Sequence, residues 1–146
     1  MSTNAKHVLN YDGSVTVYHP VRFNDWVAGE FEAICSPISQ IDQTEEPLLY
    51  EMVSAMDDAQ VVIKRRGNNT NEVFLRLEVV EVFAREVAYY LEHNEEIRKE
   101  SFGSDPCLNK VITGCRNALA NANKVLEGAG LQPITSYFQD PITLSK

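Results

Sequence analysis

The chain has 146 residues, with 13 lysines and arginines against 21 aspartates and glutamates, and its net charge is -8. This length predicts one domain, 1–146, and a hydrophobic content of 44% is enough to form a core. The negative charge disfavours direct binding of nucleic acid or of an anionic membrane, because both need a basic face. If charge selects a partner, that partner is basic.

The N-terminus predicts no targeting signal, and the cysteines predict a reducing compartment. The first seven residues are polar, and the chain contains no apolar run long enough to span a bilayer. Cys35, Cys107 and Cys115 are odd in number and form no Cys-x-x-Cys pair. We therefore expect free thiols and a cytoplasmic location.

Two short elements are predicted at the N-terminal end. Residues 7–19 are expected to form a β-hairpin arm, because Asp12-Gly13 lies between two runs of strand-forming residues. Pro20 is expected to end the second strand. Residues 24–35 predict a short helix that Asn24 caps.

The middle of the chain predicts a long helix and then an ambiguous segment. Residues 44–66 have the cap, the acidic first turn and the apolar stripe of a helix. Residues 60–77 suit either a β-hairpin or a helical hairpin that turns at Gly67. We favour the helical hairpin, since cations precede the glycine, and so expect the next helix over 71–101.

The C-terminal half predicts two long amphipathic helices, at 71–101 and 104–128, followed by a tail at 129–146. Ser104 is the expected N-cap of the helix over 104–128. Apolar residues in both helices recur at steps of three and four. The predicted fold is mostly α: an antiparallel bundle of three long helices plus one short helix, with a small N-terminal β-hairpin. Phe83 and Tyr90 widen the apolar stripe, which suggests a homodimer or other homo-oligomer.

Acidic residues concentrate on one predicted helix. Residues 71–103 contain eight acids and four cations, whereas residues 104–146 contain three acids and four cations. A solvated helix face is one interpretation. The other is a surface that binds a basic protein. Its candidate partner-binding residues are Glu78, Glu81, Glu92, Glu96 and Glu100.

Signals for catalysis are weak. Glu78 and Glu81 have the E-x-x-E spacing with which helical nucleotide pyrophosphohydrolases hold Mg²⁺. That chemistry needs a second acidic pair, and Glu45, Glu46 and Glu51 are the available acids. The three histidines are scattered, and no nucleotide-binding or nucleophile motif is present. We predict no catalytic residue, no metal site and no cofactor.

One basic cluster offers a different kind of site. Lys64, Arg65 and Arg66 complement the dipole at a helix end. As an alternative they would bind the phosphate of a small nucleotide, joined by Arg76 or Arg116.

The function expected from these features is that of a non-enzymatic interaction protein. Its partner is a protein with a basic surface, and the most concrete version is an inhibitor of a nucleic-acid-handling protein, of the phage anti-defence or nucleic-acid-mimic type. The first alternative is a small nucleotide-binding protein or Mg²⁺-dependent nucleotide hydrolase. The second is an acidic chaperone of the secretion type.

Overall fold

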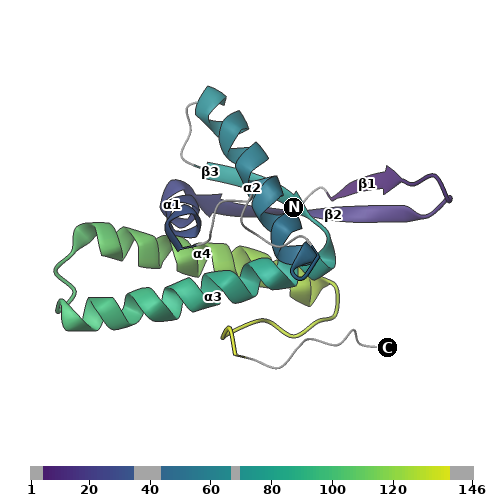
Figure 1. Ribbon diagram of the computed structural model, residues 1–146. Helices are drawn as coiled ribbons and strands as arrows, with labels where there is room; N and C mark the ends of the chain where they lie inside the picture. Colours follow the sequence, from purple (N-terminus) through teal and green to yellow (C-terminus); the bar gives the residue numbers. More distant parts are fainter. Residues whose placement is uncertain (1–4, 35–43, 67–69, 139–146) are drawn as a thin grey trace.

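The computed structural model describes residues 5–34, 44–66 and 70–138. Three strands and four helices follow one another along these ranges (Figure 1). In chain order they are β1 (Lys6–Leu9), β2 (Val15–Asn24), α1 (Asp25–Ile34), α2 (Pro47–Arg66), β3 (Thr70–Leu75), α3 (Leu77–Glu100) and α4 (Pro106–Gly128).

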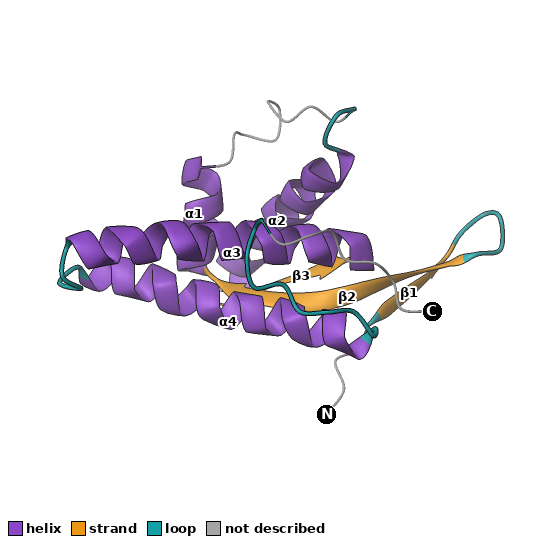
Figure 2. Cartoon of the chain, turned by 90° about the horizontal axis from the view of Figure 1, so that it is seen from below, coloured by secondary structure: helices purple, strands orange, loops and turns teal. Residues whose placement is uncertain are grey.

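The expected helical bundle is wrong, because the fold is mixed α/β. The strands form one antiparallel sheet in the order β1-β2-β3, and α3 and α4 pack against it as an antiparallel pair (Figure 2). The predicted β-hairpin is present, but β2 does not end at Pro20. It continues to Asn24 and pairs with β3, with Pro20 opposite Phe74. Among the described residues, β2 pairs with β3 alone from His19 onward, and a proline is compatible with a strand that is paired on one side only.

Strand β3 replaces the first turns of the helix predicted over 71–101. The prediction of a helical hairpin across 60–77 is therefore wrong in its second half, although α2 does extend to Arg66. Side chains alternate along β3: Asn71, Val73 and Leu75 are buried, while Glu72 is exposed and pairs with Arg22 across the sheet at 3.1 Å.

Side-chain caps explain where two of the helices begin. The Val27 backbone N–H donates to Asn24 Oδ1 at 3.0 Å, which confirms the predicted cap of α1. The cap of α4 is Asp105 rather than Ser104. Asp105 Oδ1 accepts from the backbone N–H groups of Cys107 and Leu108 at 3.0 and 3.2 Å.

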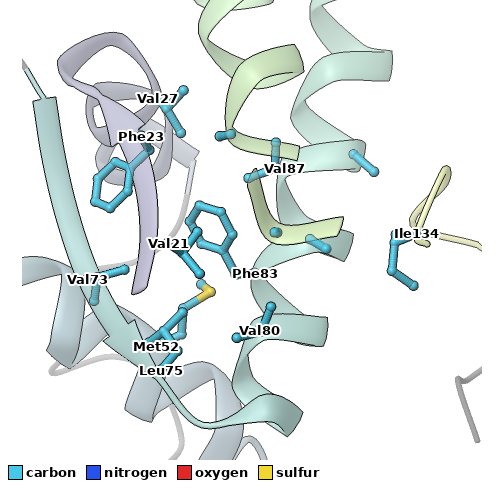
Figure 3. Packing of buried hydrophobic residues seen from close by; sticks show 14 of the residues in the cluster. Val21, Phe23, Val27, Met52, Val73, Leu75, Val80, Phe83, Val87 and Ile134 are labelled. Carbon is cyan, nitrogen blue, oxygen red and sulfur yellow. The ribbon is translucent and has the colours of Figure 1, made fainter. Parts of the chain in front are cut away.

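The hydrophobic core lies between the sheet and the helices. Val21 and Phe23 of β2 point toward Phe83 of α3, and Met52 brings α2 into the same cluster (Figure 3). Phe83 and Tyr90 are both buried within the chain. The residues that suggested a homodimer through this stripe are therefore covered by the protein's own elements.

Two segments extend from this core. The β1–β2 hairpin projects beyond the ends of α3 and α4 in both views (Figures 1 and 2). After α4 the chain turns back and runs across the helix pair as far as residue 138. None of the helices in the described ranges has the length and apolar character that crossing a membrane requires.

Candidate functional site

The five predicted partner-binding glutamates do not form one patch. They all lie on α3, but Glu78 and Glu100 are about 33 Å apart along the helix axis at 1.5 Å per residue. Glu78 accepts an ion pair from Arg76 Nη1 at 3.3 Å, and Glu81 accepts one from Arg85 Nε at 3.1 Å. The structure thus assigns the first two glutamates to local ion pairs near the start of the helix.

The other three glutamates form a continuous exposed column. Glu92, Glu96 and Glu100 follow one another at intervals of one turn, and all three are exposed. None of the ion pairs between described residues involves them. Like charges at this spacing cost a few tenths of a kcal/mol per pair, so the column opposes helix stability. We call these three residues the acidic face.

A shallow groove of about 440 Å³ lies beside the acidic face, between α3 and α4. Its lining residues are Leu91, Glu92, Glu95, Glu96, Lys99 and Arg116. Within it Arg116 Nη2 donates to Glu95 at 2.7 Å. The groove therefore contains an ion pair between α3 and α4, and two residues of the acidic face, Glu92 and Glu96, line it together with Lys99.

Exposed aromatic side chains continue the same surface toward the middle of α3. Tyr89 and His93 lie one turn apart with nearly parallel rings, 4° between planes and 6.4 Å between centroids. Tyr137 packs edge-on against Tyr89 at 5.5 Å, and Phe138 packs on Tyr137 at 5.3 Å. We call these four residues the aromatic cluster. Tyr137 and Phe138 lie within the tail predicted over 129–146, and no sequence signal marked them as part of a site. Sequence reasoning also missed Tyr89 and His93, whose signal was their i,i+4 spacing outside the apolar stripe.

The C-terminal tail is held in place, so the aromatic cluster has a defined position. Asn123 of α4 binds the backbone of Ile134 twice: its Nδ2 donates to the Ile134 carbonyl at 2.9 Å, and its Oδ1 accepts from the Ile134 N–H at 2.8 Å. Ile134 is fully buried. Arg85 Nη1 then donates to the Tyr137 carbonyl at 3.0 Å.

A second hollow, also of about 440 Å³, lies on the other side of Tyr137, between α3 and the start of α2. Its lining is apolar at Leu48, Leu49, Val82 and Pro47, and charged or polar at Glu45, Glu46, Glu86, Arg85 and Tyr137. Burial raises the pKa of Glu86 above its ordinary value, a hydrogen bond from Tyr90 lowers it, and nearby Glu46 raises it. The charged form of Glu86 is therefore disfavoured in this hollow, although Arg85 also lines it.

The arrangement required for a metal-dependent hydrolase is absent from the described residues. Arg76 donates to both oxygens of Glu51, at 2.9 and 2.7 Å, and to Glu78. A guanidinium therefore lies between the carboxylates that the Mg²⁺ interpretation needs. No three His, Cys, Asp or Glu side chains in the described part of the chain lie close enough together to hold a metal ion.

The alternative phosphate site receives no support from its expected partners. Arg76 and Arg116 both pair with glutamates of this chain. The backbone of Lys64, Arg65 and Arg66 forms the last turn of α2, and their side chains lie outside the described residues. Cys107 is exposed and Cys115 buried, both as free thiols, while Cys35 also lies outside the described residues.

Comparison with protein-family models, with characterised proteins and with solved structures finds no match to this chain. The interpretation of the site depends on its geometry alone.

Proposed function

We propose that this chain is a non-enzymatic interaction protein whose acidic face and aromatic cluster bind a basic protein surface. One observation carries the proposal. Glu78, Glu81 and Glu95 are each paired with an arginine, whereas the acidic face remains exposed and takes part in none of the ion pairs between described residues. A column of like charges that forms no ion pair among the described residues is a surface that an external cation stabilises.

The aromatic cluster adds the second component of such a surface. Arginine and lysine side chains bind the faces of aromatic rings as well as carboxylates. Tyr89, Tyr137 and Phe138 are exposed large hydrophobic side chains beside the acidic face. Aromatic anchors surrounded by charge are typical of binding hot spots.

The most specific form of the proposal is an inhibitor of a nucleic-acid-handling protein. Such a protein has a basic groove that attracts phosphate. A helix that presents a row of carboxylates offers that groove negative charges, as phosphates do. The net charge of -8 adds long-range attraction to a basic groove.

The experiment is affinity capture from the cells that produce the protein. The immobilised wild-type chain is compared with Glu92→Lys/Glu96→Lys and with the control Glu72→Lys/Glu127→Lys, which changes the net charge equally. We expect the wild type and the control to retain a basic protein that high salt elutes, and the first variant to retain at least about tenfold less. Circular dichroism verifies that each variant is folded. Equal retention by both variants, or capture only of proteins that are not basic, would contradict the proposal.

Competition with double-stranded DNA tests the inhibitor form separately. We expect DNA and this chain to displace each other from the captured protein. A ternary complex would show that the acidic face binds the partner but does not occupy its nucleic-acid site.

A further inference from the structure

The hollow between α3 and the start of α2 has an apolar wall that the fold holds in place. Leu48 and Leu49 from the first turn of α2 and Val82 of α3 line it, and all three pack against the hydrophobic core while they remain partly exposed. Its volume of about 440 Å³ falls within the range of roughly 300–1,000 Å³ that ligand sites occupy. We call this cavity, with the lining given above, the α2–α3 hollow.

The charged residues of the α2–α3 hollow are mostly acidic. Three glutamates and one arginine are among its lining residues. The arginine, Arg85, already donates to Glu81 at 3.1 Å and to the Tyr137 carbonyl at 3.0 Å, and its side chain is only 16% exposed. The hollow therefore combines apolar surface with an excess of negative charge.

Glu86 is a half-buried carboxylate in the wall of this hollow. Burial raises its pKa above the ordinary value. The Tyr90 hydroxyl donates to Glu86 Oε1 at 3.3 Å, which lowers the pKa, whereas the charge of Glu46 raises it. A cation that enters the hollow would offset both the burial of Glu86 and its repulsion from Glu46.

We propose that the α2–α3 hollow receives a lysine side chain of the basic partner. Charge complementarity selects a cation, and the apolar wall selects a cation with a long hydrocarbon stem. Lysine has both features, because four methylene groups precede its ammonium group. The stem packs on the apolar wall, and the ammonium reaches the carboxylates of Glu46 and Glu86.

Tyr137 connects the α2–α3 hollow to the surface proposed above. Its side chain is 40% exposed, lines the hollow and packs against Tyr89 of the aromatic cluster. An ammonium group close to a tyrosine ring gains a cation–π interaction. This inference rests on the proposed function, because the lysine belongs to the same partner that binds the acidic face.

Titration of the isotope-labelled chain with N-acetyl-lysine amide, followed by NMR, tests the site directly. At about pH 8 the lysine probe is still charged. We expect saturable binding with a dissociation constant on the order of millimolar, as suits a ligand of this size. The chemical-shift changes should concentrate at Leu49, Val82, Glu86 and Tyr137. N-acetyl-norleucine amide, which has the stem without the ammonium, should bind at least about tenfold more weakly.

A matched pair of variants tests the role of Glu86. Glu86→Gln removes the charge and keeps the shape of the side chain, and Glu92→Gln makes the same change on the acidic face. We expect Glu86→Gln to bind the lysine probe at least about fivefold more weakly and Glu92→Gln to bind it as the wild type does. Circular dichroism verifies that both variants are folded. In the affinity capture described above, Glu86→Gln should also retain less of the basic partner.

Separate results would overturn the separate parts of this inference. Shifts centred on the acidic face, equal binding of the norleucine probe, or undiminished binding by Glu86→Gln would overturn the site. Undiminished capture of the partner by Glu86→Gln would overturn the assignment of the lysine to that partner. Failure of the proposed function gives a different result: the lysine probe binds the hollow, which supports the site, but Glu92→Lys/Glu96→Lys captures as much as its control.

Discussion

Phe102 occupies a backbone position that helices commonly give to glycine. The Gly103 N–H donates to the Arg98 carbonyl at 2.9 Å, and the Phe102 N–H donates to the Lys99 carbonyl at 3.2 Å. This pair of bonds defines the Schellman ending of a helix, in which the first residue past the cap adopts positive φ. Here that residue is Phe102, with φ of 57° and a side chain that is 95% exposed. The ring therefore makes almost no packing contribution to offset the unfavourable backbone.

Replacement of Phe102 by glycine should stabilise the fold. A non-glycine residue in the left-handed region destabilises the folded state by about 1–2 kcal/mol, and glycine removes this cost. Glycine also gives the unfolded chain more conformational entropy, which offsets part of the gain. We expect Phe102→Gly to raise the free energy of unfolding by about 1 kcal/mol, measured by urea denaturation. Phe102→Ala is the control, since it keeps the positive φ without the ring. A glycine variant no more stable than the alanine variant would show that the backbone here is not strained.

His19 gives the fold a pH dependence at the base of the arm. Burial, and then the charge of His7, lower the pKa of His19 below the ordinary value of 6.5. The folded state then binds fewer protons than the unfolded state as the pH falls through that value, so stability decreases. We expect the wild type to lose more stability than His19→Gln between about pH 7.5 and 5.5, a range that spans the unperturbed pKa. Urea denaturation of both proteins at the two pH values measures these losses of stability. Equal losses in the wild type and in His19→Gln would show that His19 is not the source of the pH dependence.

At the scale of elements, the C-terminal tail depends on one side chain of α4. Asn123→Ala removes both hydrogen bonds to Ile134 and leaves buried backbone groups without partners. We expect this substitution to lower the free energy of unfolding by about 1–3 kcal/mol and to increase the rate of amide hydrogen exchange over residues 134–138. Asn121 is the control, because its side chain donates only to the Asn117 carbonyl in the same helix. A loss with Asn121→Ala as large as with Asn123→Ala would contradict a specific role for this anchor.

Local signals identified some elements and not others. The arm and α1 follow from a turn dipeptide and a cap, and α4 follows from apolar residues at steps of three and four. A strand over β3 was only the less favoured alternative, because Val73 fits two patterns, the spacing to Leu77 in a helix and the alternation with Leu75 in a strand. Its pairing partner is distant in the sequence, as the Arg22–Glu72 ion pair shows. No local pattern reports such a contact, and the continuation of β2 through Pro20 was missed for the same reason.

The candidate site was predictable to a similar degree. Helical spacing places Glu92, Glu96 and Glu100 one turn apart on one face, and all three are exposed in the structure. The Arg85–Glu81 ion pair follows from the i,i+4 spacing of a helix, whereas the ion pair of Glu78 with Arg76 does not correspond to a helical spacing. The contact of Tyr89 with Tyr137 arises because the tail folds back across the helix pair, a consequence of the Asn123–Ile134 bonds.

At the scale of the whole molecule, two surfaces with different chemistry lie on different elements. The acidic face lies on α3, whereas Val8, Leu9, Tyr11 and Val15 are exposed on the β1–β2 hairpin, which projects beyond the helices (Figure 1).

The central claim is that the acidic face and the aromatic cluster bind a basic surface. Titration of the isotope-labelled protein with a short oligo-arginine peptide, followed by NMR, tests it most directly, because every backbone amide reports separately. We predict that the chemical-shift changes concentrate at Tyr89, Glu92, His93, Glu96 and Glu100, and that they fall sharply in Glu92→Lys/Glu96→Lys. Changes spread evenly over all acidic residues, or centred on Glu78 and Glu81, would contradict the claim.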